Sequence, residues 1–376
     1  MKALTRRNSE FLAMLRATSI GIIVFGHVGG FWFFKPYSEF LHVFLPVFFF
    51  ISGALSYYSY KRSPSPLNYY VKRVLQLLIP YYLLCVLSLI VYLCQHHTFP
   101  KIVLNELILW LTVNPPNQLT PFPIGQVWFL HTLIIITLLS PIYFLLYSYK
   151  PSILFIFCIL VLCIAGVQTT ITGSDIFGMH TNDNIYKPLV HSIFYILGIV
   201  YFQSQYMDNK ASLLIVAIIS LAMSIGLVYV CNLNIDYEFH TYRPDLYYVS
   251  GCIFAISLLL LAKNVFVAII GKIHLAGLVL AYMHKHTFSI FVLHSLAIYL
   301  SETLLGLSNP EYKTISYGLI KLMCVVALTA LMSPPFTWLS TLITKNMLAL
   351  FGLNASSFSL YAARQPTPQL NHNETH

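Results

Sequence analysis

The sequence predicts an all-α, polytopic integral membrane bundle with about ten transmembrane helices, and composition is the first reason. Of 376 residues, 58% are hydrophobic and only 9% are charged. A soluble domain carries roughly 25% charged residues, so the deficit is too large for one water-soluble core. The formal charge of +9 is therefore interpreted by its location along the chain, and it does not predict a nucleic-acid partner.

Recurrent apolar runs of about 20 residues are the second reason, because an α-helix of that length crosses ~30 Å of hydrocarbon. Lipid admits only helices and closed barrels, and barrel strands would alternate between apolar and polar residues. The predicted spans are 12–33, 40–60, 73–95, 127–147, 152–171, 189–205, 211–231, 246–263, 287–305 and 315–343. We expect 265–284 to be an interfacial or half-inserted helix; as an extra span, it would move the C-terminus outside.

The distribution of basic residues predicts the orientation. With the N-terminus inside, the inner segments hold fourteen of the 21 Lys and Arg residues and the outer loops hold five. Cytoplasmic loops carry such an excess, so both termini are expected in the cytoplasm. Residues 1–350 form one predicted transmembrane domain, and the polar segment 351–376 is expected to be a disordered tail. The cysteines form no CxxC pair, and no metal site is predicted.

Two ionisable residues in the first predicted span are candidates for function, because charges within a membrane are costly. Arg16 and His27 are eleven residues apart, which is about 20° past three full helical turns and about 16 Å along the axis. Both side chains should therefore lie on one helix face. An arginine suits phosphate or carboxylate, and a desolvated histidine suits a general base. The alternatives are a snorkelling Arg16 and a His27 that only bonds a neighbouring helix.

Five motifs occur in a fixed order along the chain. They are Leu15-Arg16-Ala17 with Val24-Phe25-Gly26-His27, then Phe44–Gly53, Tyr69–Tyr81, Gly125–Leu130 and Ser289–His294. This set resembles the membrane acyltransferase-3 family, which O-acylates exported carbohydrates. The chain departs from the family pattern at Ala13 and Gln76, where an acidic residue and a second arginine are common. It also lacks the acidic residue that often follows the tryptophan motif.

The resemblance implies a bacterial inner-membrane O-acyltransferase that takes an acyl group, acetyl above all, from cytoplasmic acyl-CoA. The acceptor would be a hydroxyl of an exported glycan or lipid-linked saccharide, with no permanently bound cofactor. Arg16, Lys72 and Arg73 would hold the phosphates of the donor, although Lys72 is equally well explained as loop charge. His27 would deprotonate the acceptor or carry the acyl group transiently.

Two further positions are expected to contact the acceptor. Trp128 would stack on a sugar ring, or else anchor its helix in the aromatic belt. His294 would be a second polar contact, or a helix–helix hydrogen bond. The competing functions are a transporter or flippase for a polysaccharide or its lipid-linked precursor, and a non-catalytic assembly subunit.

Other polar and small residues are expected to have structural roles. Glu302 and Lys321 should pair with each other, and Ser52 and Gly53 should permit close helix packing. Four histidines of the outer loops are expected at the solvated surface: His96, His97, His180 and His240.

Overall fold

The computed structural model describes residues 5–30, 37–63, 65–100, 104–113, 127–170, 185–203, 209–307 and 314–353, and the regular elements in these ranges are all helices. The predicted all-α class is therefore confirmed. The elements are α1 (Arg6–His27), η2 (Tyr37–Val43), α2 (Phe44–Arg62), α3 (Pro66–His96), α4 (Leu104–Leu111), α5 (Val127–Tyr149), α6 (Pro151–Thr170), α7 (Tyr186–Gln203), α8 (Lys210–Cys231), α9 (Tyr237–Tyr242), α10 (Leu246–Leu261), α11 (Lys263–Lys272), α12 (His274–Leu305) and α13 (Ile315–Leu350).

Within the described ranges, eight helices are long and apolar enough to cross a membrane, and α10 with α11, bent by 59°, makes up to nine. The remaining predicted span corresponds to α7, which has 18 residues and carries Lys187 and His191. Most of its residues are buried, so protein rather than lipid surrounds it. Its polar side chains therefore lower its hydropathy without exposing charge to hydrocarbon.

Several predicted boundaries differ from those of the helices, and three differences matter for the site. Helix α1 ends at His27 instead of residue 33, because the chain turns at Gly29, whose φ of 94° favours glycine. The segment 265–284 is not one helix, since its first part belongs to α11 and its second to α12. Helix α12 consequently has 32 residues and begins at His274, thirteen residues before the predicted span. The tail after residue 353 lies outside the described residues.

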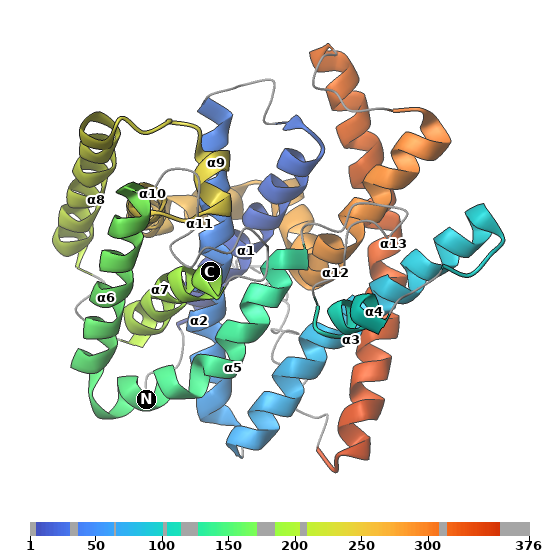
Figure 1. The fold of residues 1–376 in the computed structure, drawn as a ribbon, viewed down its shortest axis with the longest axis horizontal. Helices are drawn as coiled ribbons and strands as arrows, with labels where there is room; N and C mark the ends of the chain where they lie inside the picture. Colours follow the sequence, from blue (N-terminus) through green and yellow to red (C-terminus); the bar gives the residue numbers. More distant parts are fainter. Residues whose placement is uncertain are drawn as a thin grey trace, which may run out of the picture.

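The helices form a broad bundle in which α1 and α2 are central, α6 and α8 lie at one side, and α3 and α13 at the other (Figure 1). The most extensive contacts between helices are those of α8 with α10, of α2 with α7, and of α12 with both α13 and α1. Large apolar side chains on α8, such as Ile215, Ile218 and Ile219, are exposed. Polar side chains such as Ser192 and His294 are buried. This distribution suits a protein whose solvent is lipid.

The contact between α2 and α7 depends on two glycines, as predicted for Gly53. A Cβ atom on Gly53 would lie 1.9 Å from the carbonyl oxygen of Tyr195, and one on Gly198 would lie 1.9 Å from that of Phe50. Each helix thus presents a glycine to the backbone of the other. Small residues at such contacts let helices approach closely in a membrane.

Two predictions about polar residues had opposite outcomes. The Glu302–Lys321 pair is confirmed, because Lys321 Nζ donates to Glu302 Oε1 at 2.7 Å between α12 and α13. The prediction that His240 lies at the solvated surface was wrong. Its ring is 3% exposed and lies between Asp245 Oδ2 and the carbonyl oxygen of Asn234, both 2.7 Å away. His96 and His97 are exposed as predicted, and His180 lies outside the described residues.

Candidate functional site

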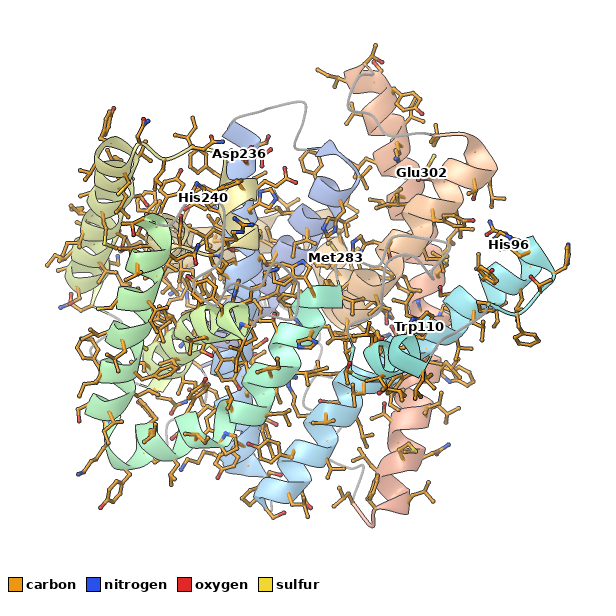
Figure 2. The ribbon with its side chains drawn as sticks, in the orientation of Figure 1. His96, Trp110, Asp236, His240, Met283 and Glu302 are labelled. Carbon is orange, nitrogen blue, oxygen red and sulfur yellow. The ribbon has the colours of Figure 1, made fainter. Side chains whose placement is uncertain are left out.

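The seam between α1 and α12 brings the predicted intramembrane residues together. His27 of α1 contacts His294 of α12, while Arg16 lies near enough to His284 to interact with it electrostatically. Gly21 of α1 also faces Met283 of α12, which is labelled in Figure 2. Arg16 precedes His27 on α1 as His284 precedes His294 on α12, so the two helices run in the same direction. Arg16 and His27 therefore share the face of α1 that meets α12.

His27 and His294 are joined by a short hydrogen bond. Nδ1 of His27 lies 2.7 Å from Nε2 of His294, and the two ring planes differ by 1°. The ring centroids are 4.9 Å apart. Because the nitrogens are much closer than the centroids, the rings meet edge to edge in one plane and do not overlap face to face. This is the alignment that an N–H···N bond requires.

The partners of His294 fix the direction of this bond. Its Nδ1 lies 2.6 Å from the carbonyl oxygen of Phe291, and a carbonyl only accepts. Nδ1 of His294 therefore carries a proton, and Nε2 of the neutral ring is an acceptor. His27 must then donate from its own Nδ1, which leaves Nε2 of His27 with a free lone pair. The contact selects the tautomer of His27 that can act as a base.

The two rings differ in accessibility in the way a base and its supporting group should. His294 is only 1% exposed, whereas His27 is exposed. Since Nδ1 of His27 is bonded to His294, Nε2 is the ring nitrogen that remains for a proton. His27 is also the last residue of α1, where the negative end of the helix dipole favours a positive imidazolium. The geometry therefore suits proton uptake at Nε2.

Arg16 lies farther from the end of its helix than the sequence indicated. Because α1 begins at Arg6, Arg16 is ten residues or about 15 Å along it, near the middle of the helix. Its side chain is partly buried and faces His284 of α12. The guanidinium thus belongs to the seam that ends at His27, rather than to the surface of the bundle.

Arg73 and Lys72 lie on a different helix, α3. Arg73 is close enough to Tyr195 of α7 to interact with it electrostatically, and Tyr195 is fully buried. Both basic side chains are only partly exposed. Arg73 therefore points into the bundle, toward a tyrosine of α7.

Trp128 lies at one end of a series of aromatic contacts that reaches the histidine pair. It lies beneath the Lys187 ammonium, with 4.9 Å between Nζ and the ring centroid, and 6.0 Å from the ring of His191. The next residue, Phe129, contacts Phe291 at a centroid distance of 5.3 Å, and Phe291 contacts His294. Trp128 and His294 are therefore linked through packed aromatic rings.

Two residues near the site were missed by the sequence reasoning. His42 of η2 is close enough to His27 to affect it electrostatically, and its Nδ1 bonds the carbonyl oxygen of Glu39 at 2.9 Å. Glu39 is buried, and its carboxylate lies within 4.8 Å of those of Asp236 and Glu238. These are the described residues whose donor set would suit a cation. The only signal in the sequence was Glu39 three residues before His42 in a predicted outer segment.

Comparison with known proteins gives one match. A family model described as an acyltransferase domain, Acyl_transf_3, matches residues 9–361, essentially the whole chain. No curated protein and no solved structure matches the chain. The matched region contains every candidate residue discussed above, including both histidines of the α1–α12 seam. The chain thus belongs to the acyltransferase-3 family and is a multi-pass membrane acyltransferase.

Proposed function

We propose that this protein is a bacterial inner-membrane O-acyltransferase that moves an acyl group, acetyl above all, from cytoplasmic acyl-CoA to a hydroxyl of an exported glycan or its lipid-linked precursor. The observation that carries the proposal is the directed hydrogen bond from His27 Nδ1–H to His294 Nε2 at 2.7 Å. It leaves Nε2 of His27, an exposed residue, unprotonated inside a membrane bundle, as a transfer from thioester to hydroxyl requires.

In the direct route, His27 Nε2 takes the proton of the acceptor hydroxyl as its oxygen attacks the thioester carbon. A C–O bond forms, the C–S bond breaks, and the proton passes to the departing thiolate. The bond to His294 and the C-terminal dipole of α1 stabilise the imidazolium formed on the way. In the alternative route, Nε2 itself attacks the thioester and expels the thiolate, which forms an acyl-imidazole. The hydroxyl oxygen then takes the acyl group as the C–N bond breaks, and its proton passes to the thiolate. Both routes need the same tautomer.

Arg16 is proposed to bind the donor, with Arg73 and Lys72 as further contacts for its phosphates. A guanidinium makes charge-assisted, bidentate bonds to phosphate. Arg16 lies on the same seam as His27 but about 16 Å from it along α1, which supports a contact with the phosphate end of the donor while the thioester reaches His27. Trp128, under Lys187 and at the end of the aromatic contacts, is proposed to hold a sugar ring of the acceptor.

The test is acyl transfer from labelled acetyl-CoA to surface glycan in cells that produce His27→Ala. A general base contributes about 10²–10⁴-fold, so the variant should lose at least about 100-fold in rate at equal protein abundance. His274→Ala, at the exposed start of α12, is the matched control and should keep full activity. Wild-type acylation in the His27→Ala strain would overturn the proposal. Glycan export lost in a deletion strain, with acylation unchanged, would instead favour the transporter.

A further inference from the structure

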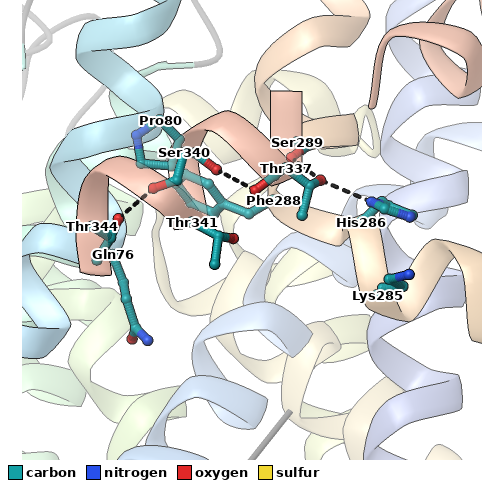
Figure 3. Close-up of a pocket in the computed structure, with 10 residues that line it drawn as sticks. All are labelled: Gln76, Pro80, Lys285, His286, Phe288, Ser289, Thr337, Ser340, Thr341 and Thr344. Carbon is teal, nitrogen blue, oxygen red and sulfur yellow. Dashed lines mark hydrogen bonds between the residues drawn. The ribbon is translucent and has the colours of Figure 1, made fainter. Parts of the chain in front are cut away.

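A polar cavity lies between α3, α12 and α13, away from the contact of His27 with His294. It is a partly open cavity with a volume of about 130 Å³. Gln76 lines it from α3, Lys285 and His286 from α12, and a set of hydroxyl side chains from α13 (Figure 3). Lys285 is nine residues before His294, which places it on the opposite face of α12 at ~100° per residue. The cavity is therefore separate from the α1–α12 seam.

Helix α13 turns a continuous hydroxyl face toward this cavity and the helices around it. The face consists of Thr329, Ser333, Thr337, Ser340 and Thr344, at spacings of three and four residues. Four of these side chains are at most 7% exposed, while the neighbouring Trp338 is 66% exposed. Such spacing keeps one side of the helix polar and leaves the other for lipid. Alanine would allow equally close packing without the cost of desolvating a hydroxyl. Packing alone therefore does not explain the hydroxyl side chains on this face.

Hydrogen bonds along this face determine what the cavity offers to a ligand. The hydroxyl of Thr337 donates to the carbonyl oxygen of Ser333 at 2.7 Å. Its oxygen therefore accepts from His286 Nδ1 at 2.8 Å and from Ser289 Oγ at 2.7 Å (Figure 3). His286 is thus held by Nδ1 and is 5% exposed. Its Nε2 is left for the cavity it lines.

The lining carries one sign of charge. Lys285 supplies an ammonium, Gln76 an amide and Thr341 a hydroxyl, whereas the hydroxyls of Ser340 and Thr344 donate to the carbonyl oxygens of Thr337 and Ser340. No carboxylate is among the residues that line the cavity. A cation beside neutral hydrogen-bond donors attracts an anion, and phosphate offers several oxygens to such donors.

The depth of the cavity along the helices is compatible with such a ligand. Helices α3, α12 and α13 have 31, 32 and 36 residues, and each exceeds the ~20 residues that cross the hydrocarbon. Gln76 is ten residues after the start of α3, and Thr344 is six before the end of α13. The cavity therefore lies toward the end of the bundle that the basic residues predict to be cytoplasmic, near the edge of the hydrocarbon.

We propose that the α3–α12–α13 cavity binds a phosphate group through Lys285, Gln76 and Thr341. Two sources share this chemistry: the nucleotide end of the acyl donor and the head group of an anionic phospholipid. Only the first of these rests on the proposed function.

The experiment uses the full chain in phosphatidylcholine nanodiscs and measures the binding of coenzyme A, of pantetheine, which lacks phosphate, and of added phosphatidylglycerol. Lys285→Met keeps the apolar stem and removes the charge. Loss of one charge-assisted contact should weaken binding of the phosphate-bearing ligand about tenfold. Pantetheine binding should not change. Lys210→Met, at the exposed start of α8, removes the same charge elsewhere and should bind like the wild type.

A tenfold loss for coenzyme A would assign the cavity to the donor, and a loss for phosphatidylglycerol alone would assign it to lipid. Thr341→Val, which removes one lining hydroxyl at nearly constant volume, should weaken the same ligand by a smaller factor. Equal binding of both phosphate ligands by the wild type and Lys285→Met would overturn the inference. A wild type that binds phosphatidylglycerol but not coenzyme A would contradict the proposed donor and leave the phosphate site standing.

Discussion

Replacing His294 tests whether it positions His27 or binds the acceptor. In His294→Leu, His27 loses the acceptor for its Nδ1–H bond at 2.7 Å, and its ring becomes free to adopt the other tautomer. A hydrogen bond of this kind contributes about 0.5–1.5 kcal/mol net, and loss of a buried partner costs about 1–3 kcal/mol. Since 1.36 kcal/mol is tenfold in rate, we expect kcat to fall about tenfold to 100-fold.

The two roles predict different kinetic parameters. If His294 only orients His27, kcat falls while the KM values for donor and acceptor remain those of the wild type, because substrate binding is untouched. If His294 contacts the acceptor, the KM for the acceptor rises. His294→Gln offers an amide oxygen that can still accept from His27, and it should recover most of the lost rate.

The assay is acyl transfer by purified protein in nanodiscs, with kcat and KM measured for acyl-CoA and for an acceptor glycan across a pH series. His274→Leu, which replaces another histidine of α12 at an exposed position, is the control for the helix itself. A His294→Leu protein with wild-type kcat and pH profile would refute the positioning role. So would a raised KM for the acceptor at unchanged kcat.

Three further predictions concern stability, each followed as the thermal midpoint in detergent. Gly53→Ala places a Cβ against a backbone oxygen of α7, and overpacking of about 1–3 kcal/mol should lower the midpoint; an unchanged midpoint would contradict the close contact of α2 with α7. Burial lowers the pKa of His240, but the hydrogen bond and charge of Asp245 outweigh it and raise this pKa above 6.5. Its stabilisation is therefore complete below pH 6.5 and is lost as the pH rises through the raised pKa, and Asp245→Asn should abolish this dependence; a variant with the wild-type pH dependence would contradict it. Glu302→Gln should destabilise more than Lys321→Met, because it leaves an ammonium that is 2% exposed, whereas Glu302 is 37% exposed; the reverse order would contradict the buried pair.

Local patterns in the sequence were enough to predict most of the architecture. Long apolar runs identify membrane helices because hydrocarbon requires every backbone group to be bonded within its own segment. The eleven-residue spacing of Arg16 and His27 placed both on one helix face, since the helical period alone decides that. The Glu302–Lys321 pair was also predictable, because an isolated charge within a span needs a partner. The helix ends were less certain, as α1 and α12 show.

Tertiary structure alone decided which of these faces meet. His27 and His294 are 267 residues apart, and no local pattern states that α1 and α12 run side by side in the same direction. The same holds for His240, which the pairing with Asp245 and Asn234 withdraws from solvent. The tautomer of His27 depends on a further contact in the structure, because the carbonyl oxygen three residues before His294 fixes the tautomer of His294. Sequence sets what each helix can present, and the packing of helices against one another determines what each side chain finally contacts.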